Sequence, residues 1–191
     1  TTPYQVGTGT DWLSVSCGGG SASVLAMKTD YSIWGWGSNA FGGLGIGSTT
    51  DKDVPTRIGN LNDWQSIQTG FYHTFVIKNN GTLWAWGHNT SGQLGDGTNI
   101  NRTTLVQIGL DTNWQGAFAG GSHSIGIKTD GTLLAWGYNN NGAIGDGTFI
   151  NKNIPTAISG VCSNLNVAPI VESNKLSLYP NPVQTILTID N

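Results

Sequence analysis

Apolar and polar residues alternate over short runs along most of this chain. The pattern is clearest in alternating runs at residues 64–69, 73–78, 82–87 and 104–108, which are separated by glycine-rich or polar segments. Alternation with a period of two is typical of β-strands. Asn80-Gly81 is a strong signal for a two-residue hairpin, because both residue types tolerate a positive φ. The pattern predicts four short antiparallel strands.

The same pattern recurs every 50 residues, as the Trp-Gly pairs at 36–37, 86–87 and 136–137 show. So long a period marks a solenoid, a propeller or an array, and four antiparallel strands per repeat describe a propeller blade. We therefore predict an all-β fold with blades at 12–59, 64–109 and 114–159. Residues 3–7 match 55–59, so we interpret residues 1–7 as the last strand of a preceding blade.

Large and small residues, not apolar and charged ones, alternate within the predicted strands. Phe75 and Ile77 point to one face, and the residue between them, like its counterparts in the other repeats, is smaller. A sheet with one exposed face would carry charges on that face, so we expect each sheet to be covered on both sides by neighbouring blades. About three and a half blades cannot close a ring, which takes about four to eight. We expect the chain to be an excerpt of a longer protein.

Composition excludes several classes of function. Charged residues make up 10% of the chain, the net charge is −3, and no Lys/Arg cluster is present. Binding to nucleic acid or to an anionic membrane normally needs a basic patch, so we expect neither. No apolar run approaches the roughly 20 residues of a membrane span. Cys17 and Cys162 form no disulfide framework, and isolated thiols are favoured over a bridge between them.

Several motifs in each repeat resemble those of the regulator of chromosome condensation repeat family. They are Gly-x-x-His-(Thr/Ser) at 70–74 and 120–124, (Asn/Asp)-Gly-Thr-Leu, Trp-Gly-x-Asn and Gly-x-(Leu/Ile)-Gly-Asp-Gly. The resemblance covers residues 1–160 and implies a seven-bladed propeller that presents its loops to a partner. The first copy departs from the pattern. It has two extra residues in the glycine-rich segment that follows Cys17, and Ile46 replaces the aspartate of Gly-Asp-Gly.

A second resemblance follows a linker at 161–174. Residues 175–191 look like the opening of a C-terminal type IX secretion sorting domain, a small β-sandwich. The motif that carries this resemblance is Leu178, Tyr179, Pro180, Asn181 and Pro182. It implies that the type IX secretion machinery exports the protein, which would then be secreted or held on the outer surface of a Gram-negative bacterium. The chain stops before such a domain would end.

Candidate catalytic and metal-binding residues have architectural explanations. His73 and His123 recur at one position in successive repeats, as packed or hydrogen-bonded residues of the fold would. Asp96 and Asp146, with asparagines nearby, offer the oxygen ligands that calcium prefers, but Asp and Gly are also favoured in tight turns. No catalytic constellation can be argued, so we predict no enzymatic activity, no cofactor and no metal.

The search for function therefore turns to residues that differ between repeats. Exposed aromatic residues are enriched in binding surfaces, and in a four-stranded blade the loops between strands one and two and between strands three and four lie on one rim. The alternative is that these residues cap the edge of their own blade. The candidate ligand-binding residues are Phe41, Phe71, Tyr72, His88, Tyr138 and Phe149.

These observations predict a secreted or surface-displayed propeller that binds an extracellular protein or a polysaccharide. The alternative is an accessory module of a secreted enzyme whose catalytic domain lies in an N-terminal part outside this chain. An intracellular exchange factor for a GTPase, by family analogy, conflicts with the export tail.

Overall fold

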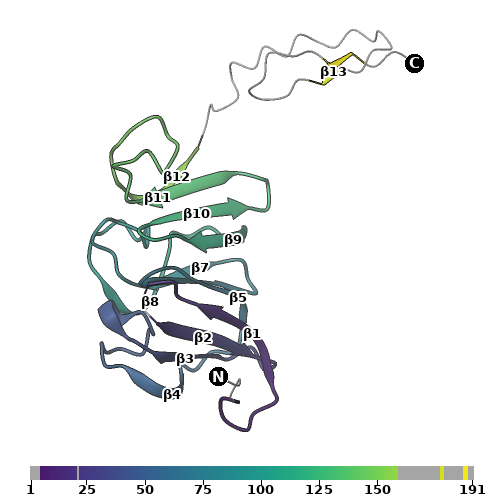
Figure 1. The fold of residues 1–191 in the computed structure, drawn as a ribbon, viewed down its shortest axis with the longest axis vertical. Coiled ribbons are helices and arrows are strands. Elements are labelled where there is room, and N and C mark those ends of the chain that lie inside the picture. The colour runs from purple at the N-terminus through teal and green to yellow at the C-terminus, as the bar shows by residue number, and fades with distance from the viewer. Residues whose placement is uncertain (1–4, 21, 159–176, 179–186, 189–191) are drawn as a thin grey trace. The chain divides into compact units, whose positions relative to one another are not determined.

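The structure, a computed structural model, describes residues 5–20, 22–158, 177–178 and 187–188. The chain divides into two compact units, residues 1–159 and 160–191. The first unit contains three sheets of four antiparallel strands each (Figure 1). In the described part of the chain, no helix is long and apolar enough to cross a membrane.

Each 50-residue repeat forms one sheet, and we call the three sheets blades 1 to 3. Within the described residues the one helical element is the 3-10 turn η1, Ala40–Gly42, in blade 1. The strands are β1 Trp12–Cys17, β2 Ser23–Lys28, β3 Ile33–Gly37 and β4 Lys52–Arg57 in blade 1; β5 Trp64–Thr69, β6 His73–Lys78, β7 Leu83–Gly87 and β8 Arg102–Gln107 in blade 2; and β9 Trp114–Ala119, β10 His123–Lys128, β11 Leu133–Gly137 and β12 Lys152–Ala157 in blade 3. The prediction of all-β, propeller-like blades is confirmed.

The second unit is described only at two short strands. β13, Ser177–Leu178, pairs antiparallel with β14, Leu187–Thr188. Leu178 of the sorting motif therefore lies in a strand. Tyr179, Pro180, Asn181 and Pro182 lie outside the described residues, as do Cys162, the linker at 161–174 and residues 1–4 of the preceding-blade strand. Residues 5–7 of that strand carry no β-structure.

The hairpin between β6 and β7 differs from the predicted two-residue turn. Only Gly81 adopts a positive φ, of 78°. Asn80 instead uses its side chain, whose Oδ1 accepts hydrogen bonds from the Thr82 amide (3.2 Å) and hydroxyl (2.7 Å). The amide of Gly81 donates to Lys78 O at 2.8 Å, and a Cβ at Gly81 would collide with the carbonyl of Thr112. Glycine is thus required by both the turn and the next blade.

Stacking of the blades buries the core between their faces. The aliphatic face of one blade packs on the tryptophan face of the next, as the large-and-small pattern predicts. A buried aromatic side chain removes about 150–250 Å² from water, so these rings dominate both interfaces. Between blades 1 and 2 the core contains Leu25, Met27, Ile33, Ile58, Trp64, Ile67, Val76 and Trp86. Between blades 2 and 3 it includes Phe75, Ile77, Leu83, Ile108, Trp114, Ala117 and Trp136.

The interfaces are also held by one hydrogen bond that repeats with the blades. Trp86 Nε1 donates to Gly43 O at 2.8 Å, and Trp136 Nε1 donates to Gln93 O at 2.9 Å. Both tryptophans are fully buried. A buried indole N–H needs such a partner, so this bond fixes where each blade sits on the long loop of the preceding blade.

Candidate binding site on the loop rim

The long loop after the third strand of each blade is built around a buried asparagine. Asn89 Nδ2 donates to Thr98 O and Ile100 O, and its Oδ1 accepts from the Leu94 amide at 2.9 Å. Asn39 and Asn139 repeat this arrangement. These three residues lie in the Trp-Gly-x-Asn motif, but the sequence alone did not reveal that they organise the loops. They make the rim a rigid platform.

The Gly-Asp-Gly aspartates serve the same loops. Asp96 Oδ1 accepts from the Thr98 amide and hydroxyl, and Asp96 Oδ2 accepts from Arg102 Nε at 2.7 Å. Burial opposes the ionisation of Asp96, but hydrogen bonds from Thr98, Arg102 and Asn89 outweigh it and lower the pKa of this carboxyl group. Both oxygens are thus engaged by the protein. Among the described residues no group of three His, Cys, Asp or Glu side chains gathers to hold a metal, and the geometry supports the turn interpretation.

Three of the six candidate residues meet at the junction of blades 1 and 2. The ring centroids of Phe41 and His88 are 4.4 Å apart, those of Phe41 and Tyr72 are 5.3 Å apart, and those of Tyr72 and His88 are 6.2 Å apart. We call this set the aromatic rim cluster. Its members come from the η1 loop of blade 1, the β5–β6 loop and the β7–β8 loop. Separate segments thus build one aromatic surface.

The backbone of Phe41 is unusual. Its φ is +58°, a left-handed conformation that bulky residues rarely adopt and that costs on the order of 1–3 kcal/mol. The side chain is nevertheless 42% exposed. At the equivalent positions Ser91 and Asn141 no positive φ occurs. Blade 1 alone turns its backbone in a way that presents an aromatic ring on the rim.

His88 is held in one neutral form. The Ser91 amide donates to Gln93 Oε1 at 2.9 Å, which orients the Gln93 amide so that its Nε2 donates to His88 Nδ1 at 2.8 Å. The proton of His88 is therefore on Nε2, from which it reaches Thr90 Oγ1 at 2.9 Å. Burial lowers the pKa of His88, so the ring that faces Phe41 is uncharged at neutral pH.

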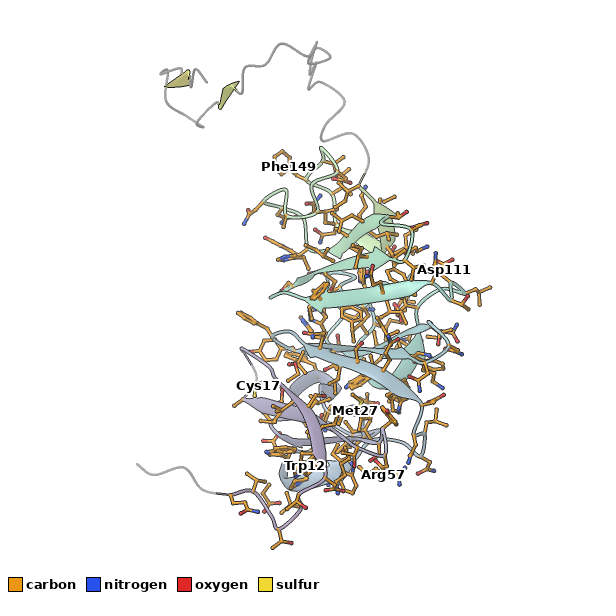
Figure 2. All side chains as sticks on the ribbon, turned by 90° about the vertical axis from the view of Figure 1, so that its right-hand side faces the viewer. Trp12, Cys17, Met27, Arg57, Asp111 and Phe149 are labelled. Carbon is orange, nitrogen blue, oxygen red and sulfur yellow. The ribbon has the colours of Figure 1, made fainter. Side chains whose placement is uncertain are left out.

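The other three candidates lie apart from this cluster. The Phe71 ring lies close to Gly19 and Gly20 in the insertion of blade 1, where a Cβ at Gly20 would be 2.8 Å from Phe71 Cγ. Phe71 thus fills space beside the two-residue insertion while remaining half exposed. Tyr138 and Phe149 belong to blade 3, and Figure 2 shows Phe149 on the same side of this unit as Cys17, opposite Asp111. Among the described residues no ring contact joins either to the cluster.

His73 is an architectural residue. Its Nε2 contacts Ser124 Oγ of blade 3 at 3.0 Å, and Ser124 Oγ donates to Gln93 O at 2.8 Å. The serine proton is thus already used, so His73 Nε2 is the donor to Ser124. Burial is the main cause that lowers the pKa of His73 to about 3, with smaller contributions from His88 and His123. A neutral, inaccessible imidazole that links two blades has no access to substrate.

Two family models match the repeats, and both are described as Regulator of chromosome condensation (RCC1) repeat. One matches residues 32–77 and 80–127, and the other matches residues 64–93 and 117–143. Together these matches cover more than half of the chain. The chain belongs to the RCC1 repeat family. Propellers of this family are generally interaction modules.

Two solved structures show the same fold. Yeast RCC1 (Prp20), solved in complex with Kap60, superposes with a TM-score of 0.70 at 19% identity, over 80% of this chain and 38% of that chain. Human WBSCR16 superposes with a TM-score of 0.67 at 20% identity, over 78% of this chain and 38% of that one. The present chain thus spans well under half the length of these structures.

Curated relatives match over shorter segments. Mouse E3 ubiquitin-protein ligase HERC2 is 35% identical over 49 residues, which are 26% of this chain and 1% of the ligase. The Arabidopsis thaliana ultraviolet-B receptor UVR8 is 31% identical over 61 residues, which are 31% of this chain and 14% of the receptor. The chain therefore spans only a small part of the curated relatives it matches.

Proposed function

We propose that this chain is a non-catalytic binding module that recognises an extracellular protein through the aromatic rim cluster of Phe41, Tyr72 and His88. The observation that carries the proposal is that the cluster is built from residues that differ between repeats, on loops that share the same buried asparagine and its hydrogen bonds. Residues that the fold does not demand are free to serve recognition.

The repeats provide an internal control for this argument. At the junction of blades 2 and 3, the residues equivalent to Phe41, Tyr72 and His88 are Ser91, Ser122 and Tyr138. The backbone bonds are nevertheless the same, since His88 N donates to Tyr72 O and Tyr138 N donates to Ser122 O, both at 2.8 Å. The rim therefore forms with serine at two of the three positions, and the aromatic rings at the first junction are not needed to build it.

A protein ligand fits the chemistry of this cluster better than a polysaccharide. Phe and Tyr are enriched in the cores of protein interfaces, where they bury large areas at a low cost in entropy. The neutral His88 has both nitrogens engaged by Gln93 and Thr90, so the Tyr72 hydroxyl is the one side-chain group of the cluster left to bind the hydroxyl groups of a sugar.

The experiment replaces the cluster residues with those of the sister repeat. The Phe41→Ser/Tyr72→Ser variant carries the residues of the second junction, and Phe149→Ser is the matched control for an exposed aromatic on another blade. We expect Phe41→Ser/Tyr72→Ser to lose binding about 30-fold or more, as loss of an interface hot spot does, with an unchanged melting temperature. Pull-down of surface proteins and a glycan array, both with purified full chain, provide the measurement.

Two outcomes would contradict the proposal. Equal binding by wild type and by Phe41→Ser/Tyr72→Ser would assign the aromatic rings to packing. A ligand found only on the glycan array would assign the module to polysaccharides.

We also propose that the protein is exported by type IX secretion and acts outside the cell or on its surface. The support is the motif Leu178, Tyr179, Pro180, Asn181 and Pro182. Changing Pro180 and Pro182 to alanine in the source bacterium should retain the protein inside the outer membrane. Immunoblots of surface, periplasmic and culture fractions measure this, and an unchanged distribution would refute the assignment.

A further inference from the structure

The outer edge of the junction between blades 1 and 2 carries a surface feature apart from the aromatic rim cluster. A groove of about 580 Å³ runs there along β4 and faces the outer strands of blade 2. We call it the perimeter groove, and the residues that define it are Ile46, Lys52, Arg57, Leu61, Trp84 and Leu105. None of them belongs to the aromatic rim cluster.

The floor of the perimeter groove is apolar and continuous with the core. Ile46, Trp84 and Leu105 are partly buried and pack against the core between blades 1 and 2. Trp64, which is fully buried, also lines the groove. The floor is therefore an apolar shelf that can remove a ligand's side chains from water.

One cation in the groove lacks the partner that its counterparts have. In blade 2, Arg102 binds Asp96 at 2.7 Å, and in blade 3, Lys152 binds Asp146 at 3.1 Å. Lys52 stands at the same position of blade 1, but Ile46 replaces the aspartate. Among the described residues no carboxylate lies within ion-pair distance of Lys52. Asp51 and Asp53 flank Lys52 in the sequence, but neither forms an ion pair with it.

The second cation is also particular to this junction. Arg57 stands where blade 2 has Gln107. Its Nη2 donates to Asn60 O and to Asn62 Oδ1, which leaves the Nε and Nη1 donors for a ligand. The nearby Asp30 contacts the Asn62 amide at 3.2 Å instead of Arg57.

The lining of the groove contains no acidic residue among the described residues. Leu61 stands where the segment after blade 2 has Asp111, which binds Lys128 at 2.7 Å. At this junction Asp63 binds the equivalent Lys78 instead, at 3.2 Å. The groove therefore combines two cations with an apolar floor.

We propose that the perimeter groove binds an extended acidic peptide segment, with one acidic residue at each end and apolar residues between them. Lys52 and Arg57 are the first and last residues of β4. Because β4 is bulged, they pair with Gly37 and Trp34 of β3, so about 10 Å separates them at roughly 3.3 Å per residue. An extended peptide covers that length with acidic residues about three positions apart. The carboxylates meet Lys52 and Arg57, and the intervening side chains lie on Ile46, Trp84 and Leu105.

The apolar floor selects a peptide over an acidic polysaccharide. Each sugar unit carries hydroxyl groups, and burial of a hydroxyl group without a hydrogen-bond partner is unfavourable. Between its two cationic ends the groove offers mainly Ile46, Leu61, Trp84 and Leu105. An alternating acidic and apolar peptide matches that distribution of charge and apolar surface.

The test pans a displayed hexapeptide library on four forms of the full chain. They are the wild type, Lys52→Gln/Arg57→Gln, Ile46→Asp and the matched control Lys152→Gln. Ile46→Asp removes no cation but restores the carboxylate that blades 2 and 3 possess. Lys152→Gln removes one positive charge, at a position whose charge Asp146 already neutralises. Thermal melting verifies that each variant is folded.

We expect wild type and Lys152→Gln to select peptides with two acidic residues. Lys52→Gln/Arg57→Gln and Ile46→Asp should not select them, and fluorescence anisotropy of a selected peptide should show at least about tenfold weaker binding to both. Exchange of its acidic residues for amides should weaken binding to wild type by a similar factor.

Three results would overturn the proposal. They are selection without acidic enrichment, unchanged binding by either groove variant, and tighter binding of polygalacturonate that depends on Lys52 and Arg57. The groove and the rim are tested separately, because Phe41→Ser/Tyr72→Ser should bind the selected peptide as wild type does.

Discussion

At the scale of single residues, His73 shows how the fold restricts the chemistry of a titratable group. Its ring is 1% exposed, and its Nδ1 has no hydrogen-bond partner. A charged imidazole there would lose its hydration without gaining a counter-charge. The fold therefore stabilises the neutral ring, which donates through Nε2 to Ser124.

The depressed pKa of His73 makes the stability of the first unit depend on pH. With a pKa of about 3 in the folded state, against 6.5 as its ordinary value, the unfolded chain binds a proton between these values and the folded chain does not. This contribution to stability is complete above pH 6.5 and is lost progressively as the pH falls toward 3. The free energy of unfolding should fall by up to about 1.4 kcal/mol per pH unit.

Denaturant unfolding at intervals between pH 7 and pH 4 measures this slope. The control is His73→Gln, whose side-chain amide can still donate to Ser124 but does not titrate in this range. His88 also has a lowered pKa, so the difference between the two proteins, not the slope of the wild type alone, reports on His73. The same slope in both proteins would show that His73 is not the group responsible.

At the scale of elements, periodicity predicted the bounds of β5 and β6, whose pairing shifts by one residue between Trp64 and Ser66, but not those of β8, where the shift is two residues. β5 and β6 have the bounds expected from alternation, at 64–69 and 73–78. The fourth strand of blade 2 was expected at 104–108 but spans Arg102–Gln107. The reason is an irregularity between Ala85 and Gly87, after which Gly87 pairs with Arg102. A shift of register depends on the partner strand, so alternation within one segment cannot predict it.

The candidate sites were predictable only in part. Differences between repeats predicted Phe41, Tyr72 and His88 as candidate binding residues. The contact between their rings depends on how blade 2 packs on the loop of blade 1, and the sequence of a single repeat does not determine that packing. The same signal also selected Phe71, which lies against the glycine-rich insertion of blade 1. The sequence alone shows that Ile46 replaces the aspartate found at positions 96 and 146. The consequence for Lys52 became visible only once the pairing of Asp96 with Arg102 was known.

At the scale of the whole first unit, its two end blades present faces that are buried elsewhere in the stack. Val15 is 65% exposed on blade 1, whereas Ile67 at the same position of blade 2 is 4% exposed. Leu133 is 43% exposed on blade 3, whereas Leu83 is fully buried. The exposed face of blade 1 is a tryptophan face, and the exposed face of blade 3 is an aliphatic face. These two faces can therefore pack on each other as the faces of neighbouring blades do within the stack.

Complementary faces at opposite ends of one unit produce head-to-tail association. We expect the purified 191-residue chain to form oligomers whose mean mass rises with concentration, as measured by light scattering. Val15→Glu should block the face of blade 1, and Leu133→Glu should block the face of blade 3, because each places a charge in an apolar interface. Each variant alone should be monomeric.

An equimolar mixture of these two variants distinguishes this association from unspecific aggregation. Val15→Glu retains an intact blade 3 face, and Leu133→Glu retains an intact blade 1 face, so one copy of each can join through the two unblocked faces. The resulting pair presents only blocked faces, and growth must stop at the dimer. Unspecific aggregation through exposed apolar residues would produce no such limit. Monomers in the mixture, or growth beyond dimers, would therefore contradict a stacking interaction between the end blades.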